Sequence, residues 1–120
     1  MPQKPSQTGD RPLSPQVLQI LLSLTGKRMH GYAIIRDVRE RTDGQVRLTA
    51  GTLYSALKRM MDAGLIEESE KRPVPELDDE RRRYYAITKE GRRALEAETV
   101  RFESFLAMAR EKGVLRSRGA

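Results

Sequence analysis

The stretch "LTAGTLYSALKRMMDAGLIE", residues 48–67, sorts its side chains onto two opposite sides of one helix. At about 100° per residue, Leu53, Leu57 and Met60 fall within one narrow arc, which Tyr54 and Met61 flank. The opposite arc carries small and charged residues: Gly51, Ser55, Lys58, Arg59 and Asp62, with Thr52 close by. Any fold of this chain must therefore bury one face of the helix and expose the other.

Capping residues predict where the helices begin and end. Thr49 can accept a hydrogen bond from a free N–H group of the first turn, and Gly64 suits the position that follows a helix. An earlier helix near residues 14–25 begins at Ser14 and Pro15, because serine caps N-termini and proline fits the first helical position.

This first helix is apolar around most of its circumference. Its apolar side chains form two stripes: Val17, Leu21 and Leu24, with Ile20 beside them, and Leu18 with Leu22. A helix of this kind is buried on more than one side. One side can face its own domain, and we expect the other to need a further cover.

A second helix near residues 30–42 is amphipathic. Its core stripe follows the i, i+3, i+4, i+7 spacing: Gly31, Ile34, Ile35 and Val38. Two opposite-charge pairs lie four residues apart on the solvent side: Arg36 with Glu40, and Asp37 with Arg41. The alternating "VRL" that follows, residues 46–48, predicts a very short strand.

Two strands and a loop follow the third helix. "LIEESEK", residues 65–71, and "RRRYYAI", residues 81–87, are strand candidates, and the proline-containing "RPVPELDDE", residues 72–80, is a loop between them. The three segments predict a hairpin. In a regular strand Tyr84 and Tyr85 point to opposite faces, so we expect one of them in the core.

Thr88 predicts the start of a long final helix near residues 88–112. Apolar and small residues recur along it at steps of four and three: Leu95, Thr99, Phe102, Leu106 and Ala109. Phe105 widens this heptad-like seam. The seam has no expected partner within its own chain, which indicates a contact between two copies.

The composition limits the class of protein. The chain has 120 residues, of which 38% are hydrophobic and 33% charged, so a compact domain needs a partner chain to bury enough apolar area. The absence of cysteine excludes disulfide frameworks and cysteine zinc sites, and it suggests a reducing cytoplasm. "MPQKPSQTGDRP" at the N-terminus lacks the apolar core of a secretion signal, and "VLQILLSL" is far shorter than the roughly 20 residues that span a bilayer. We expect a cytoplasmic protein with no membrane partner.

The order of the elements predicts a fold class: mainly α with a small β-hairpin wing, that is, a winged helix-turn-helix plus a long C-terminal dimerisation helix. We expect a disordered N-terminal tail over residues 1–12 and the DNA-binding domain over residues 13–88. The dimerisation helix is expected over residues 89–113 and a flexible tail over residues 114–120. The net charge of +6 favours a polyanionic partner, most often nucleic acid.

In this fold the third helix is the recognition helix, and its outward residues become candidate DNA contacts: Thr49, Gly51, Thr52, Tyr54, Ser55, Lys58 and Arg59. Five cations of the wing join them: Lys71, Arg72, Arg81, Arg82 and Arg83. Four acids lie between these cations, so we expect the arginines rather than the acidic tip to approach the DNA backbone. For Tyr54 two roles remain open, since its ring can simply pack or its hydroxyl can reach a phosphate.

Three motifs in order, "HGYAIIRDVRER", "LTAGTLYSALKRMMDAGLIE" and "DERRRYYAITKEGRRALEAE", resemble the PadR family of bacterial transcriptional regulators. The resemblance covers most of residues 13–100, and the short C-terminal portion is similar to the branch with one C-terminal helix. The family usually has a proline where Ala50 stands. The resemblance implies a homodimeric repressor that binds an operator with two-fold symmetry, and that a small aromatic molecule weakens DNA binding in some members.

The expected dimer interface combines the uncovered side of the first helix with the seam of the last one: Leu18, Leu22, Leu95, Thr99, Phe102, Phe105, Leu106 and Ala109. On such an interface Phe102 and Phe105 can serve as interface core, the favoured interpretation, or they can line a slot for a planar effector. The sequence offers no tryptophan to stack on such a ligand.

Other functions have less support. A lone histidine without cysteines or clustered acids makes a poor metal site, so His30 is interpreted as a helix-start or packing residue rather than a metal ligand or pH sensor. Glu67, Glu68 and Glu70 lie on a surface strand without a nucleophile or glycine-rich loop nearby, so we expect no enzyme, cofactor or metal. The rival to a DNA-binding repressor is a winged-helix module used only for protein–protein assembly.

Overall fold

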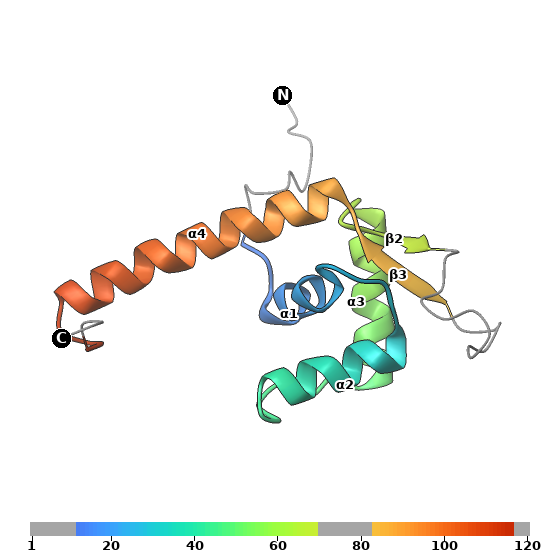
Figure 1. Cartoon of the computed structure of the whole chain (residues 1–120), viewed down its shortest axis with the longest axis horizontal. Helices are drawn as coiled ribbons and strands as arrows, with labels where there is room; N and C mark the ends of the chain where they lie inside the picture. Colours follow the sequence, from blue (N-terminus) through green and yellow to red (C-terminus); the bar gives the residue numbers. More distant parts are fainter. Residues whose placement is uncertain (1–11, 70–82, 117–120) are drawn as a thin grey trace.

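The computed structural model of the chain describes residues 12–69 and 83–116. In chain order this part contains α1 (Pro15–Leu24), β1 (Met29–His30), α2 (Gly31–Arg41), α3 (Ala50–Asp62), β2 (Ile66–Ser69), β3 (Tyr84–Ile87) and α4 (Lys89–Glu111) (Figure 1). The strands form an antiparallel sheet in the order β1-β3-β2. The fold is the predicted winged helix-turn-helix followed by a long C-terminal helix. The expected N-terminal tail up to residue 11, the loop over residues 72–80 and the chain end from residue 117 lie outside the described residues.

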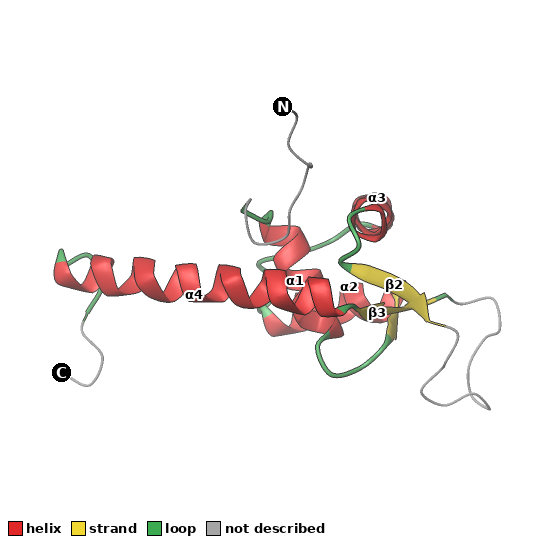
Figure 2. Ribbon diagram, turned by 90° about the horizontal axis from the view of Figure 1, so that it is seen from above, coloured by secondary structure: helices red, strands yellow, loops and turns green. Residues whose placement is uncertain are grey.

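Helices α1, α2 and α3 and the sheet enclose the hydrophobic core. The three helices and two of the strands contribute buried side chains: Ile20, Leu21 and Leu24 from α1, Ile34 and Val38 from α2, Leu53, Leu57 and Met60 from α3, Ile66 from β2 and Tyr85 from β3. Helix α4 adds Ala94 to this core and then continues past α1, away from the rest of the described chain (Figures 1 and 2). None of the described helices is both long and apolar enough to cross a membrane.

The predicted helix caps are present. At three helix starts a hydroxyl oxygen accepts a hydrogen bond from a backbone N–H three residues on: Ser14 from Val17 (3.2 Å), Thr49 from Thr52 (3.1 Å) and Thr88 from Gly91 (3.0 Å). Gly64 follows α3 with a φ of 79°, in the left-handed region that glycine adopts without strain. Each cap uses only residues close in sequence, which is why these helix ends were predictable.

Strand β1 was not expected. Met29 pairs with Tyr85 and His30 with Tyr84, so two residues before α2 add a third strand to the predicted hairpin. Tyr85 lies in the core, as expected for one of the two tyrosines. Tyr84 on the opposite face is buried as well, because the His30 ring packs edge-on against it with ring centroids 5.3 Å apart.

The prediction of a short strand at residues 46–48 is wrong, since this segment of the described structure forms no strand. Its alternation has another cause. Leu48 is buried in the core, whereas Arg47 is exposed and donates a hydrogen bond from Nε to the carbonyl oxygen of Gly44 (3.1 Å). The segment therefore closes the α2–α3 connection over the core rather than joining the sheet.

His30 begins α2, as the helix-start interpretation predicts. Its Nδ1 accepts a hydrogen bond from the Ala33 N–H (3.2 Å), which satisfies one of the free donors of the first turn. The same ring covers Tyr84. Both roles are structural.

A polar network joins α1 to α2 through the half-buried carboxylate of Asp37. The Ser23 hydroxyl donates to Asp37 Oδ2 (2.7 Å), and Arg41 donates to the same oxygen (2.8 Å), which confirms the predicted Asp37–Arg41 pair. Arg41 also donates to the carbonyl oxygen of Gln19 (3.0 Å). Burial raises the pKa of Asp37, but the hydrogen bonds from Arg41 and Ser23, with the charges of Arg41 and Lys27, lower it more, so the net direction is downward.

A second carboxylate joins α4 to the segment before α1. Glu98 is buried, and its two oxygens accept hydrogen bonds from the Leu13 N–H and from Nε of Arg101 (2.9 Å for the latter). The Leu13 hydrogen bond lowers the pKa of Glu98, burial opposes it, and Arg101 lowers it further. The charged form of Glu98 is therefore favoured by folding.

Acid should weaken the fold partly through Glu98. A carboxyl whose pKa is lowered by folding stabilises the native state above its unfolded pKa of about 4.3, and this contribution disappears as the pH falls through the folded value. We expect Glu98→Gln to lower the free energy of unfolding at pH 7 by about 1.5–3 kcal/mol and to flatten the loss of stability below about pH 4. Urea unfolding at several pH values measures both. Glu96→Gln, at an exposed position of the same helix, should change neither, and an unchanged acid limb in Glu98→Gln would contradict the assignment.

Candidate nucleic-acid interface

Helix α3 turns its apolar face inward and its small and cationic face outward. Leu53, Ala56, Leu57 and Met60 are each at most 2% exposed. The predicted contact residues of this segment are all exposed: Thr49, Gly51, Thr52, Tyr54, Ser55, Lys58 and Arg59. Because burial follows the periodicity of the sequence, the outward row of α3 is the row that the sequence predicts.

The N-terminal half of this row leaves room for a close approach. A Cβ atom built at Gly51 would meet nothing within 4 Å, and the hydroxyl of Thr49 donates to that of Thr52 (3.0 Å), so these short side chains stay near the helix. The partial positive charge at a helix N-terminus favours phosphate. The arrangement therefore allows a duplex backbone to come near the first turn of α3.

The cations follow one turn later. Arg59 donates from Nη1 to the Ser55 hydroxyl (2.9 Å), so its guanidinium lies along the exposed face of the helix. Lys58, its neighbour, is exposed as well. The two charges can reach phosphate oxygens or guanine edges of a duplex lying against this face.

The wing is described only at its base. Arg83 is exposed and forms an ion pair with Glu68 of β2 (3.5 Å), which is weak because both side chains are in contact with solvent. The other four predicted wing contacts, Lys71, Arg72, Arg81 and Arg82, lie outside the described residues. Strand β3 carries the chain from this region directly into the core at Tyr85.

The start of α2 holds candidate contacts that the sequence analysis did not identify. Tyr32 is 60% exposed, its ring stacks on that of His30 at 6.5 Å between centroids, and the guanidinium of Arg36 lies 5.8 Å from the centre of the Tyr32 ring. In helix-turn-helix proteins the helix before the recognition helix crosses the DNA backbone. The spacing of Tyr32 and Arg36, one helical turn apart, is the signal that could have revealed them.

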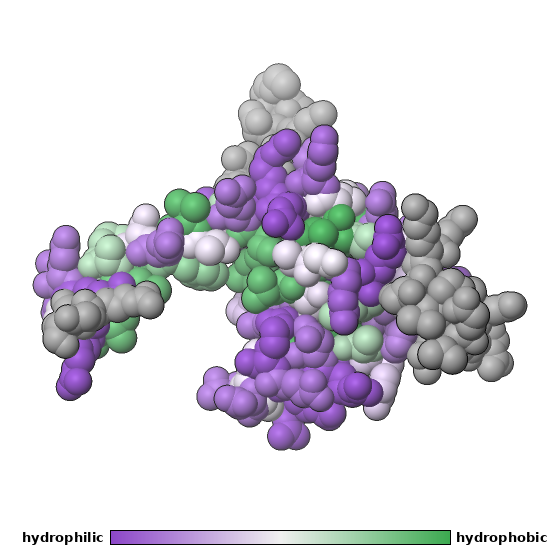
Figure 3. Space-filling model, viewed as in Figure 1, coloured by the Kyte–Doolittle hydropathy of each residue, from purple (hydrophilic) through white to green (hydrophobic). Residues whose placement is uncertain are grey.

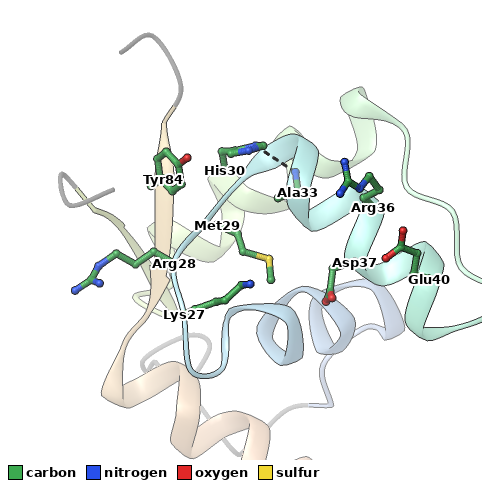
Figure 4. Close-up of a pocket in the computed structure, with 9 residues that line it drawn as sticks. All are labelled: Lys27, Arg28, Met29, His30, Ala33, Arg36, Asp37, Glu40 and Tyr84. Atoms are coloured by element: carbon green, nitrogen blue, oxygen red, sulfur yellow. Dashed lines mark hydrogen bonds between the residues drawn. The ribbon is translucent and has the colours of Figure 1, made fainter. Parts of the chain in front are cut away.

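A pocket of about 310 Å³ lies beside this surface, between the α1–α2 connection, α2 and β3 (Figure 4). Figure 4 shows the side chains of Lys27 and Met29 directed toward α2, whereas Arg28 points away from the other residues. Two carboxylates of α2, Asp37 and Glu40, line the same pocket as the cations of Lys27 and Arg36. Arg28 lines the pocket as well, so three cations accompany two carboxylates and their charges nearly cancel, which gives the pocket no clear preference for an anion.

A second candidate surface runs along α1 and α4. Between these helices lies a pocket of about 290 Å³, lined by Leu22, Thr25, Arg92, Leu95, Glu96 and Thr99. Leu22 is 48% exposed, Leu18 is half-buried, and Leu95 packs partly against the core. The Thr99 hydroxyl donates to the carbonyl oxygen of Leu95 (2.9 Å), so this hydrogen bond is satisfied within α4.

The remaining residues of the expected dimer seam lie on the projecting half of α4. Phe102, Phe105 and Leu106 are 52%, 65% and 40% exposed, and Ala109 is half-buried. Hydrophobic residues follow α4 and the adjacent surface of α1 in the space-filling view (Figure 3). The pocket between α1 and α4 is lined by other residues than Phe102 and Phe105, so the expected effector slot is not enclosed within one chain.

Comparisons with known proteins place the chain among transcriptional regulators of one family. The model of the PadR-like family of transcriptional regulators matches residues 20–97. A solved PadR family transcription regulator from hypervirulent Clostridium difficile R20291 is 32% identical with a TM-score of 0.66, over 82% of this chain and 97% of that one. A transcriptional regulator from Clostridium thermocellum is 26% identical with a TM-score of 0.60, over 84% of this chain and 92% of that one.

A PadR-like transcription factor from Bacteroides fragilis shares the fold, with a TM-score of 0.65 at 20% identity, over 80% of this chain and 87% of that one. No curated protein sequence matches the chain significantly. The family match spans more than half of the 120 residues, and the fold agrees with it. The chain therefore belongs to the PadR-like family, as a DNA-binding transcription regulator.

Proposed function

We propose that the chain is a homodimeric repressor that binds an operator with two-fold symmetry through α3 of each copy. The observation that carries this proposal is the sorting of α3. Its residues Leu53, Ala56, Leu57 and Met60 are at most 2% exposed, and its outward residues are exposed: Gly51, Ser55, Lys58 and Arg59. A helix buried on one side and cationic on the other fits the major groove of a duplex. Residues 13–88 would bind DNA and residues 89–113 would pair the copies in the cytoplasm.

Helix α4 supports the dimer. Its inward face in the first turns carries Gly91, Ala94 and Glu98, all buried. Continuing at the same three- and four-residue steps leads to Phe102, Phe105 and Ala109, and the two phenylalanines are more than half exposed. The same face of α4 is thus covered by its own domain in the first turns and exposed to solvent in the later turns. A second copy related by two-fold symmetry can cover both uncovered halves in one isologous contact.

A small aromatic effector fits the same interface. Phe102 and Phe105 supply flat apolar surface, and the slot between α1 and α4 lies on the same helix one to two turns earlier. A planar molecule held between the copies would change how the two α3 helices are spaced. Because both half-sites must be bound together, a small change in this spacing would weaken operator binding.

Selection from a random duplex library tests the function. The purified protein should enrich an inverted repeat whose half-sites lie about one helical turn, roughly 34 Å, apart. Enrichment of an unpaired half-site would contradict the symmetric operator. Enrichment of no sequence at all would reject operator binding and favour the protein–protein assembly module.

A further inference from the structure

The phenol of Tyr54 lies directly on the first residue of α2. A Cβ atom built at Gly31 would overlap the Tyr54 hydroxyl oxygen, and it would lie 2.8 Å from Cζ of that ring and 3.2 Å from Cδ2 of Leu53. Gly31 is buried, whereas Tyr54 is 50% exposed. The tyrosine therefore has its hydroxyl end packed on α2, while half of the residue remains open to solvent.

The same phenol is close enough to Tyr85 of the sheet to affect the pKa of that residue. Burial raises the pKa of the Tyr85 hydroxyl, and the neighbouring Tyr54 and Glu68 raise it further, whereas Arg83 lowers it. Tyr85 lies in the central strand β3, opposite Met29 of β1. The hydroxyl of Tyr54 thus sits where the recognition helix, the start of α2 and the sheet meet.

We propose that Gly31 is a positioning residue for DNA recognition, because its missing side chain leaves the space in which the Tyr54 ring lies and thereby holds the Tyr54 hydroxyl on the surface that faces the operator. The proposal rests on the proposed function, since it assigns a role in operator binding. It also joins the two roles that the sequence left open for Tyr54: the hydroxyl end of the ring packs on Gly31, and this contact fixes the hydroxyl at a place that a phosphate can reach.

The nature of the overlapping group decides what a side chain at position 31 would do. The group is the far end of a half-exposed tyrosine, which can swing into solvent, and alanine is a better helix former than glycine. Gly91 is different, because a Cβ atom there would overlap the backbone carbonyl oxygen of Leu65, which cannot swing aside. Gly31→Ala should therefore displace Tyr54 and leave the fold intact, whereas Gly91→Ala should destabilise the fold.

A double-mutant cycle tests the proposal. The dissociation constants of the wild type, Gly31→Ala, Tyr54→Ala and the double variant are measured by fluorescence anisotropy on the selected operator and on a duplex of unrelated sequence. We expect each single variant to bind the operator roughly ten- to thirtyfold more weakly, since one hydrogen bond to phosphate is lost in each half-site. The double variant should bind no more weakly than Tyr54→Ala, because the displaced ring is already absent.

Several results would overturn the proposal. Operator binding by Gly31→Ala or by Tyr54→Ala at the wild-type level would do so, and so would a double variant whose loss equals the product of the two single losses. The double variant lacks the overlapping ring, so it keeps the test decisive even when Gly31→Ala alone does not fold.

Two comparisons separate positioning from stability and from the proposed function. Gly91→Ala should lower the midpoint of thermal unfolding and bind the operator normally at temperatures where it is folded. Gly31→Ala should keep the wild-type midpoint and bind the operator more weakly. A wild-type protein that selects no operator rejects the proposed function itself, and the role of Gly31 falls with it. If the wild type selects an operator but the losses of the two single variants multiply in the double variant, only the role of Gly31 is rejected.

Discussion

Phe102→Asp is expected to convert the protein into a monomer and to weaken operator binding by about a hundredfold or more. Phe102 is 52% exposed in the single chain and lies on the continuation of the buried face of α4. A charge placed there would have to be desolvated in a contact between two copies, which is unfavourable without a partner charge. Separated copies would bind one half-site each and lose the gain from binding two half-sites at once.

The measurements for this prediction are sedimentation velocity and operator titration on the same samples. Leu106→Asp, at a position 40% exposed on the same face, should behave alike. Val100→Asp is the matched control, since Val100 is 54% exposed on the opposite side of α4. We expect it to remain dimeric and to bind normally. A dimeric Phe102→Asp variant, or a monomeric Val100→Asp variant, would show that the copies meet elsewhere.

The double variant Lys58→Ala/Arg59→Ala is expected to bind the operator at least about a hundredfold more weakly at low salt. In a dimer each substitution removes two contacts, one in each half-site. If these are phosphate contacts, the slope of log affinity against log salt should fall by about two for each substitution. A base contact would instead leave the slope nearly unchanged and relax the preference at one position of each half-site.

Titrations at four or more salt concentrations distinguish these outcomes, with each single variant measured beside the pair. Arg39→Ala is the control for net charge, because Arg39 is an exposed cation in the last turn of α2. It should change affinity and slope only slightly. Ser55→Ala adds a finer test, since the Ser55 hydroxyl accepts the hydrogen bond that orients Arg59. Wild-type affinity in the double variant across the salt series would show that α3 is not the recognition helix.

The helices and their exposed faces could be predicted from the sequence because the forces that set them act between near neighbours. The hydroxyl caps at Ser14, Thr49 and Thr88 each bind an N–H three residues on. The buried row of α3 repeats with the period of the helix, and Tyr85 of β3 lies in the core as expected for one of the two tyrosines. Candidate DNA contacts on α3 followed from this periodicity, as did the uncovered seam of α4.

Contacts between distant segments were decided only in the folded chain. Strand β1 exists because Met29 and His30 meet Tyr85 and Tyr84, more than fifty residues away. Glu98 binds the Leu13 N–H across 85 residues, and the ring of Tyr54 rests on a glycine of another helix. Period and propensity describe one element at a time, so they determine which face is buried. Which partner covers that face depends on how the elements pack, and packing involves residues that no local pattern connects.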